Sequence, residues 1–525
     1  MSFAAFVSRA GLLSAGFLTA LVCRAATCEN LNSVSIPKTT ITKTELVAAG
    51  AFPALPGRGG GEGGRPRFDD LPAFCRVAAT ARPTGDSEIK IEVWLPAALP
   101  GQPSGWNGKL RGTGNGGLGG GAGVGVGALA AGVRGGYATV GSNTGHDGDA
   151  SYALNHPEKI IDFGYRSAHE MTVAAKALIA AFYGSAPKLS YMAECGGGSI
   201  AALSEAQRYP ADYDAIAAGG FGADLTHHTA GQLWIWQATH KDAASYIPPE
   251  KYPALHKAAL DKCDAADGVK DGVISDPAHC DFDPAVIECK SLNAADGPTC
   301  LTAPQVEAAR KIYAGPKNPR TGKQVFSPLF PGSELGWAQL AGPKPLGIAT
   351  DFFKYFAFRD PSWDYNTRPI NFDSDIDLAN KPENLPVDAM DPDLKKFTGR
   401  GGKLLLFNGW NDTSIPPGVA VDYYKSALAK TGAKTLQSDM RFFMVPDMGH
   451  CPGSNGADSY NFDSLSLIVD WKENGKAPDQ LVATHFKDGK EAGTRLACRY
   501  PDVPTYKGSG SGDDSANFMC KRVSK

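Results

Sequence analysis

The chain has 525 residues, with 52 Lys or Arg against 55 Asp or Glu, and its formal net charge is −3. Hydrophobic residues make up 42% and charged residues 20%, a composition typical of globular proteins and unlike that of disordered chains. The near-neutral balance disfavours nucleic-acid binding. Because the one long apolar stretch lies at the N-terminus, a multi-span membrane protein is excluded. The length allows about three domains, or one large core carrying an insertion.

The first segment, residues 1–26, has the pattern of a secretory signal. Arg9 precedes an apolar run over residues 10–23, and the small residues Ala25 and Ala26 follow it. A buried N-terminal helix is the alternative. A lipoprotein anchor at Cys23 is disfavoured because no small residue precedes that cysteine. We therefore predict an exported protein, secreted or periplasmic, with no stable membrane association.

The cysteine count agrees with export. Of eleven cysteines, ten follow the predicted signal, and an even number in an exported chain predicts five disulfides. No two of them are spaced as C-x-x-C, which disfavours zinc binding and thioredoxin-like chemistry. The spacing leaves the connectivity open. The ten are Cys28, Cys75, Cys195, Cys263, Cys280, Cys289, Cys300, Cys451, Cys498 and Cys520.

Strand and helix patterns alternate toward both ends of the chain. A glycine-rich loop tip is expected at residues 57–65 and a glycine-rich turn at 112–123. Short apolar runs predict strands at residues 88–95, 188–193, 403–407 and 441–445. Helical spacing predicts helices at residues 167–182, 200–209 and 464–473. This alternation predicts an α/β fold with a parallel sheet flanked by helices.

The middle of the chain, residues 222–390, interrupts this alternation. It holds four cysteines, a Pro-rich tract and many aromatic residues, among them Trp234, Trp337 and Phe352. We interpret it as an inserted lid domain between two parts of a catalytic domain, residues 27–221 and 391–525. Its aromatic residues could fill the insertion's own core or line a pocket for a planar substrate.

Two polar residues follow consecutive predicted strands near the C-terminus. Asp412 lies after strand 403–407 in FNGWNDTSIPP, and His450 lies after strand 441–445 in VPDMGHCPG. A hydrolase with an α/β sheet places its nucleophile on a tight strand-to-helix turn, followed in the chain by an acid and then a histidine. Strand 188–193, the CGGG turn and helix 200–209 supply that context. We predict His450 as general base and Asp412 as its orienter.

The nucleophile position of this turn is unusual. If Gly198 closes a G-x-S-x-G elbow, the serine position is occupied by Gly196, which has no side chain. Ser199 lies nearly one turn further on, where its hydroxyl is expected to pack or to cap the helix, and it is a weak alternative nucleophile. Cys195 is the stronger nucleophile chemically, but a disulfide would remove its thiol. Water activated by His450 is a slow third option.

The segment YMAECGGGSIAALSEAQRYPADYDAIAAG resembles the elbow of the tannase and feruloyl esterase family, which also includes a hydrolase of mono(2-hydroxyethyl) terephthalate. That family has G-C-S-x-G-G-R-x followed by a helix ending E-A-Q-R-Y-P. The resemblance runs from about Cys28 to the C-terminus and is specific at the elbow helix, at GWNDTSIPP and at MGHC. Counting back from Gln207 places Gly196 on the family serine. Glu194, Ser199 and Ile200 also depart from the family residues.

The resemblance implies specific disulfides and a fold. It pairs Cys195 with Cys451, which would tie the elbow to the histidine loop and hold the catalytic geometry. The fold implied is an α/β-hydrolase sheet flanked by helices, with a large inserted lid. The other implied pairs are Cys28–Cys75, Cys263–Cys280, Cys289–Cys300 and Cys498–Cys520.

The glycine-rich stretch GNGGLG, residues 114–119, is a candidate oxyanion hole. It follows a strand-like segment, where an esterase directs backbone N–H groups toward the developing negative charge. By resemblance, Gly116 or Gly117 supplies one donor and Gly197 the other. A merely flexible loop is the alternative, and the absence of a GK[ST] ending disfavours phosphate binding.

The sequence CDAADGVKDGVI, residues 263–274, is a candidate calcium loop. Asp264, Asp267 and Asp271 lie close together, and hard carboxylate oxygens at this density suit Ca²⁺. The spacing excludes an EF-hand. By resemblance, the backbone carbonyls of Val269 and Val273 complete the ligands, and the ion is structural. A solvated acidic turn is the alternative.

The leading functional hypothesis is an exported carboxylic ester hydrolase acting on small aromatic-acid esters such as feruloyl, galloyl or terephthalate monoesters. A catalytically silent homologue that binds aromatic esters or acids is the second. An enzyme that uses water or Ser199 for different chemistry is the third. The specific ester and the oligomeric state are left open by the sequence.

Overall fold

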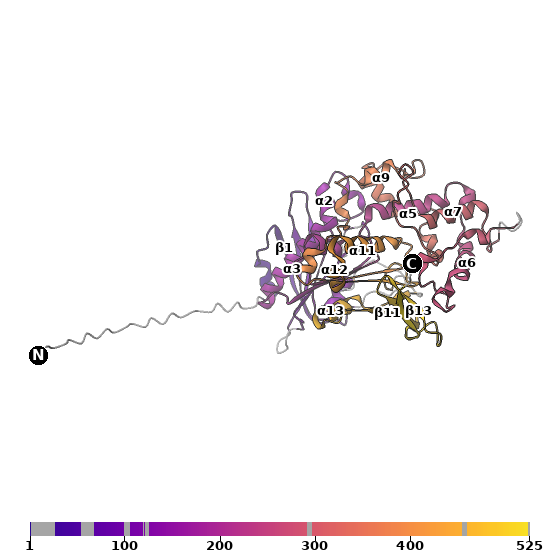
Figure 1. The fold of residues 1–525 in the computed structure, drawn as a ribbon. Helices are drawn as coiled ribbons and strands as arrows, with labels where there is room; N and C mark the ends of the chain where they lie inside the picture. Colours follow the sequence, from indigo (N-terminus) through magenta and orange to yellow (C-terminus); the bar gives the residue numbers. More distant parts are fainter. Residues whose placement is uncertain are drawn as a thin grey trace.

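The computed structural model describes Met1 and residues 27–53, 68–98, 105–118, 120, 125–290, 297–453 and 459–522 (Figure 1). The predicted signal segment, apart from Met1, and the loop tip at residues 57–65 lie outside the described residues. None of the helices in the described part of the chain is both long and apolar enough to cross a membrane.

A nine-stranded sheet with the order β1-β2-β3-β5-β4-β6-β7-β8-β9 forms the centre of the molecule. From β5 through β9 every neighbouring pair is parallel, as predicted. The strands are β1 (Thr39–Val47), β2 (Phe74–Ala81), β3 (Ile89–Pro96), β4 (Lys109–Gly112), β5 (Ala138–Ser142), β6 (Leu189–Cys195), β7 (Ala215–Gly219), β8 (Lys403–Gly409) and β9 (Met440–Val445).

The N-terminal third of this sheet departs from the prediction of a parallel sheet. β1 pairs antiparallel with β2, β2 with β3, and β3 with β5. The connection between β2 and β3 spans only residues 82–88. A parallel crossover needs a dozen or more residues, so this connection permits only antiparallel pairing. The sheet is therefore mixed.

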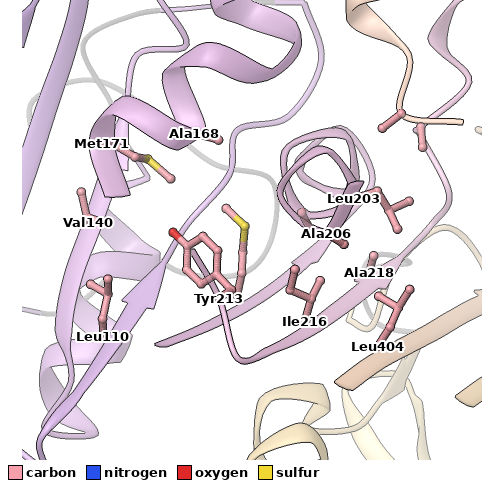
Figure 2. Packing of buried hydrophobic residues seen from close by; sticks show 14 of the residues in the cluster. Leu110, Val140, Ala168, Met171, Leu203, Ala206, Tyr213, Ile216, Ala218 and Leu404 are labelled. Atoms are coloured by element: carbon pink, nitrogen blue, oxygen red, sulfur yellow. The ribbon is translucent and has the colours of Figure 1, made fainter. Parts of the chain in front are cut away.

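Helices cover both faces of the sheet because its central strands are apolar on both sides. In β7, Ile216 and Ala218 face one cluster of buried residues, which includes Leu203 of α4, while Ala215 and Ala217 face another. Figure 2 shows Leu203 and Ala206 above the strands that carry Ile216 and Leu404. The helices around the sheet are α1 (Val126–Arg134), α2 (Pro157–Ile161), α3 (Ser167–Tyr183), α4 (Gly198–Arg208), α11 (Gly418–Thr431), α12 (Ala433–Asp439) and α13 (Ser464–Asn474).

The insertion between β7 and β8 contributes to two apolar clusters, one of its own and one shared with the rest of the chain. Trp337 is fully buried in the insertion's own cluster, whereas Phe352, Phe353 and Phe356 are fully buried in the shared one, which also contains Tyr152. In Figure 1, α5, α6, α7 and α9 gather on the side of the molecule away from β1 and α3. The insertion's helices are α5 (Leu225–Thr239), α6 (Tyr252–Cys263), α7 (Ala303–Ala314), α8 (Gly347–Asp351) and α9 (Ser374–Ala379), and α10 (Lys395–Gly399) precedes β8.

The C-terminal part contains strands that the sequence patterns do not predict. β10 (Ser459–Asn461), β11 (Gln480–Lys487) and β12 (Lys490–Cys498) form an antiparallel sheet. β13 (Asp502–Tyr506) and β14 (Phe518–Arg522) form a second one. The first half of β12 is exposed, so these strands lack the continuous apolar runs that identify β8 and β9.

Five disulfides have the pairings implied by the family resemblance: Cys28–Cys75, Cys195–Cys451, Cys263–Cys280, Cys289–Cys300 and Cys498–Cys520. Their number fits an oxidising compartment. Only the Cys195–Cys451 bond joins segments far apart in the sequence, with a separation of 256 residues.

Candidate active site

The tight turn between β6 and α4 has the geometry of a nucleophile elbow. Gly196 has a φ of +64°, a left-handed conformation that residues with side chains seldom adopt. Its N–H donates to the carbonyl of Gly219 at 2.9 Å. A Cβ on Gly222 would lie 2.7 Å from the carbonyl oxygen of Gly196, so backbone packs directly on backbone here. The predicted strand-turn-helix arrangement is therefore present.

Asp412 and His450 meet at the ends of β8 and β9. His450 Nδ1 lies 2.9 Å from Asp412 Oδ2, and Asp412 Oδ1 accepts a hydrogen bond from the N–H of Ile415 at 2.9 Å. Asp412 is fully buried. Burial alone would lower the pKa of His450, but the charge and hydrogen bond of Asp412 outweigh it and raise that pKa. Facing a carboxylate, Nδ1 holds a proton, which leaves Nε2 as the basic nitrogen.

The basic nitrogen of His450 points to position 196. A Cβ on Gly196 would lie 2.7 Å from His450 Nε2. The disulfide between Cys195 and Cys451 joins the residues next to these two positions. Since this bond occupies the sulfur of Cys195, no thiolate is available there. The elbow thus aligns a base with a position that lacks a nucleophilic side chain.

Ser199, the weak alternative nucleophile, is held in the backbone of the elbow. It is fully buried, its hydroxyl donates to the carbonyl of Gly196 at 2.6 Å, and the N–H of Gly222 donates to that hydroxyl at 2.9 Å. The hydroxyl proton is therefore directed at a carbonyl and not at His450. These bonds give Ser199 a structural function in the turn.

The candidate oxyanion glycines come together beside the elbow. A Cβ on Gly197 would lie 2.6 Å from the backbone nitrogen of Gly117 and 2.9 Å from the Cα of Gly116. His146, which the sequence did not single out, braces this loop through a bond of 3.1 Å between its Nε2 and the carbonyl of Leu118. Burial lowers the pKa of His146 to about 4, so the ring is neutral and Nε2 donates.

A cavity of about 180 Å³ opens beside His450. It is lined by residues of the elbow, the oxyanion loop, α5 and the loop after β8. Sequence reasoning missed the two buried polar residues among them, His228 and Gln232, because a four-residue spacing on a helix carries no chemical signature by itself. The lining is Gly117, Gly197, Ile200, Gly222, Leu225, His228, Gln232, Leu346, Ile348, Ser414, Ile415 and His450.

Glu194, which replaces the family glycine, is enclosed by the elbow. A Cβ on Gly198 would lie 2.6 Å from its Oε2, and one on Gly114 would lie 3.3 Å away. Burial of the carboxyl raises the pKa of Glu194 to about 7, although the charge of Arg111 and the amide of Gly114 oppose this shift. The side chain thus places a titrating carboxyl beneath the turn.

The candidate calcium loop follows α6. Asp264 accepts hydrogen bonds from the amides of Asp271 and Gly272, at 3.2 and 3.0 Å. Asp267 accepts from the hydroxyl of Ser275 at 2.6 Å, and Arg495 donates to Asp271 at 2.5 Å. Across the described residues, no group of three or more His, Cys, Asp or Glu is arranged to hold a metal ion. The chemistry of three clustered carboxylates fits a hard cation, and calcium here stays a prediction.

Comparisons of sequence identify relatives of the chain. The family described as "Tannase and feruloyl esterase" matches residues 75–521. An uncharacterized esterase of Xanthomonas campestris pv. campestris is 34% identical, and the match covers 97% of this chain and 93% of the relative. A probable feruloyl esterase B-2 of Aspergillus fumigatus is 31% identical over 85% of this chain and 86% of the relative.

Comparisons of structure agree with these relatives. Feruloyl esterase B from Aspergillus oryzae superposes with a TM-score of 0.83 at 28% identity, covering 94% of this chain and 99% of the other. A tannin acyl hydrolase from Aspergillus niger superposes with a TM-score of 0.76 at 20% identity, covering 95% of each chain, and shows the shared fold. The predicted α/β-hydrolase fold is confirmed. The chain belongs to the tannase and feruloyl esterase family of carboxylic ester hydrolases.

Proposed function

We propose that this protein is an exported esterase scaffold for small aromatic-acid esters, with a glycine at the nucleophile position. The observation that carries the proposal is the alignment of His450 Nε2 with position 196, where a Cβ would lie 2.7 Å away. The relatives named feruloyl esterase, together with the family described as "Tannase and feruloyl esterase", support esters of aromatic acids as the substrate class. The five disulfides support export.

The chemistry follows from the positions of these groups. The ester carbonyl would lie between Gly196 and the oxyanion loop, so that the N–H groups of Gly117 and Gly197 stabilise the negative charge on its oxygen. Without a serine, a water molecule attacks the carbonyl carbon and gives its proton to His450 Nε2. That proton then passes to the departing alcohol, and Asp412 stabilises the imidazolium in between. Removing a triad serine costs about a million-fold in kcat in a related mechanism, so we expect this direct route to be slow.

The second candidate is a silent homologue that binds aromatic esters or acids. It is favoured by the bonding of the neighbouring nucleophiles, because Ser199 is held by backbone groups and Cys195 by a disulfide. In this case the cavity beside His450 retains its ligand while turnover is lost.

Hydrolysis of methyl ferulate, methyl gallate and a terephthalate monoester by the unaltered protein and by Gly196→Ser tests the proposal. We expect the variant to exceed the unaltered protein by about a thousandfold or more in kcat/KM for at least one ester. Gly196→Ser combined with His450→Ala is the matched control and should lose that gain. Labelling of the variant with diisopropyl fluorophosphate should map to residue 196.

Each remaining outcome has a defined meaning. Turnover only by the variant supports the silent homologue as the state of the native chain. Comparable turnover by both proteins would contradict the assignment of position 196. No turnover by either would contradict the aromatic-ester substrate.

We further propose that Asp264, Asp267 and Asp271, with the carbonyls of Val269 and Val273, hold a structural Ca²⁺. Three clustered carboxylates support a hard cation, although Arg495, which donates to Asp271, already balances part of their negative charge. Calcium added after chelation should raise Tm, whereas Mg²⁺ should not. Asp264→Asn should abolish the response. Failure of calorimetry to detect Ca²⁺ binding would contradict this site.

A further inference from the structure

The basic nitrogen of His450 faces a space that position 196 leaves unfilled. The Nδ1 atom is bound to Asp412 at 2.9 Å, whereas Nε2 makes no hydrogen bond with any of the described residues. A Cβ on Gly196 would lie 2.7 Å from Nε2, so even the first carbon of a side chain there would press on the ring. In this chain the same volume can be entered by part of a bound molecule.

Two backbone donors lie in the wall of the same cavity. Gly117, Gly197 and His450 all line the cavity of about 180 Å³. Within the described part of the chain, the N–H groups of both glycines are free of hydrogen bonds. A Cβ on Gly197 would lie 2.6 Å from the nitrogen of Gly117, so the two peptide groups are close together. Paired donors of this kind stabilise negative charge on an oxygen, whether it belongs to a tetrahedral intermediate or to an enolate.

A base opposite such donors, with no nucleophile between them, suits the removal of a proton from carbon. In a serine esterase the serine oxygen lies between the base and the carbonyl carbon. Without it, a carbonyl compound can approach His450 more closely by about one carbon–carbon bond, ~1.5 Å. This shift brings the carbon next to the carbonyl group to Nε2 while the carbonyl oxygen stays beside Gly117 and Gly197. A hydrogen on that carbon is acidic because its removal gives an enolate.

The charges of the site favour this proton transfer. Asp412 raises the pKa of His450 against the effect of burial, which makes Nε2 a stronger base and stabilises the imidazolium that forms. The imidazolium and Asp412 then balance each other, and the remaining negative charge lies on the enolate oxygen, at the amide donors. Ile200, Leu346 and Ile348 add apolar walls to the cavity. Such walls strengthen the hydrogen bonds to that oxygen and leave room for an aromatic ring.

We propose that the unaltered protein removes and returns a proton at the carbon beside the carbonyl group of arylacetic esters. His450 Nε2 takes the proton as the C–H bond breaks, and the electron pair passes into an enolate whose oxygen is bound by the N–H groups of Gly117 and Gly197. The imidazolium exchanges its proton with water, because the His450 side chain is 27% exposed, and a proton from it returns to the same carbon. The ester bond remains intact, so this activity goes beyond the proposed hydrolysis.

Proton NMR in D₂O with methyl 4-nitrophenylacetate tests this activity. Both the ester and the nitrophenyl ring acidify the CH₂ group of this probe. Loss of the CH₂ signal measures exchange with solvent, and release of methanol measures hydrolysis in the same sample. We expect the unaltered protein to exchange the CH₂ protons about a hundredfold or more faster than His450→Ala. Exchange no faster than in buffer, or equally fast in His450→Ala, would overturn the proposal.

Variants then assign the exchange to the space at position 196. Gly196→Ala fills that space without adding a nucleophile, so it should slow exchange by about tenfold or more and gain no hydrolysis. Gly196→Ser should slow exchange equally but gain hydrolysis. His279→Ala is the matched control and should keep full exchange, because it removes another histidine paired with a carboxylate, Asp276 at 2.7 Å, outside the cavity lining.

The two activities can fail independently of one another. Urea midpoints of each variant ensure that exchange is compared between folded proteins. Undiminished exchange in both variants at position 196 overturns this inference. Absence of hydrolysis by Gly196→Ser, with exchange by the unaltered protein intact, refutes the esterase function and leaves the proton transfer standing.

Discussion

The Nε2 atom of His450 lies 2.7 Å from the point that a Cβ on Gly196 would occupy. A base and an elbow 254 positions apart in the sequence are thus placed against one another by β9 and β6, which belong to the same sheet, and by the Cys195–Cys451 bond. This contact is shorter than Cβ atoms make, so a serine at 196 would require the imidazole to shift. The ring can do so because it is the far end of a side chain that is 27% exposed.

Side chains at position 196 should lower stability. The left-handed backbone of Gly196 strains any residue with a Cβ, so Gly196→Ser and Gly196→Ala should each reduce the free energy of unfolding by about 1–3 kcal/mol. Urea denaturation measures this loss. The alanine variant is the matched control, because it should show the same loss of stability without the gain in hydrolysis. Unchanged stability in both variants would contradict the strained elbow.

Asp412→Asn should reduce turnover in the Gly196→Ser background. Without the carboxylate, His450 loses the acceptor that holds its Nδ1 proton, and kcat should fall by about 10⁴ while KM changes little. In the Gly196→Ser variant that keeps Asp412, the base acts unprotonated and Asp412 raises its pKa. The kcat of that variant should therefore rise with pH through an inflection above 6.5. A small decrease in kcat, or an inflection below that value, would contradict the assigned pair.

Ser199 should contribute to the stability of the fold and not to ester hydrolysis. Ser199→Ala leaves the N–H of Gly222 and the carbonyl of Gly196 without this partner, so the free energy of unfolding should fall by about 1–3 kcal/mol. Diisopropyl fluorophosphate should leave Ser199 of the unaltered protein unlabelled in mass spectrometry. Labelling of Ser199 by this reagent would contradict the structural function and would show that Ser199 is a nucleophile.

Glu194 should make stability depend on pH. Its pKa is about 7 in the folded protein against an ordinary value of 4.5, so between these values the folded state holds a proton that the unfolded state has released. The free energy of unfolding contributed by this group is therefore fully present at low pH and falls as pH rises from about 4.5 to about 7. Urea midpoints at about pH 5 and pH 7.5 should differ less in Glu194→Gln than in the unaltered protein. An identical pH dependence in both would contradict the raised pKa.

The Cys195–Cys451 bond should contribute to catalysis as well as to stability, unlike a short-range disulfide. Replacing both cysteines by alanine should lower the free energy of unfolding by about 2–5 kcal/mol and, with serine at 196, should also lower kcat, because the elbow and the histidine loop are no longer joined. Cys289→Ala with Cys300→Ala is the matched control: that bond closes a separation of 11 residues, joins neither the elbow nor the histidine loop, and should leave kcat unchanged. Equal effects of the two replacements on kcat would contradict the special function of the first bond.

Local patterns in the sequence determined much of this architecture. β8 and α4 were predictable because an apolar run and a helical period are properties of neighbouring residues. The order of elbow, Asp412 and His450 follows from the chain itself, and the family resemblance implied the disulfide pairs. Only the tertiary structure decided that β1 to β3 pair antiparallel, that Ser199 serves the turn and that Glu194 is enclosed. It also decided that His228 and Gln232 of α5 line the same cavity as His450. These facts depend on contacts between residues distant in sequence, which no local pattern encodes. Burial in such contacts determines the pKa of a side chain and whether its hydrogen bonds are satisfied.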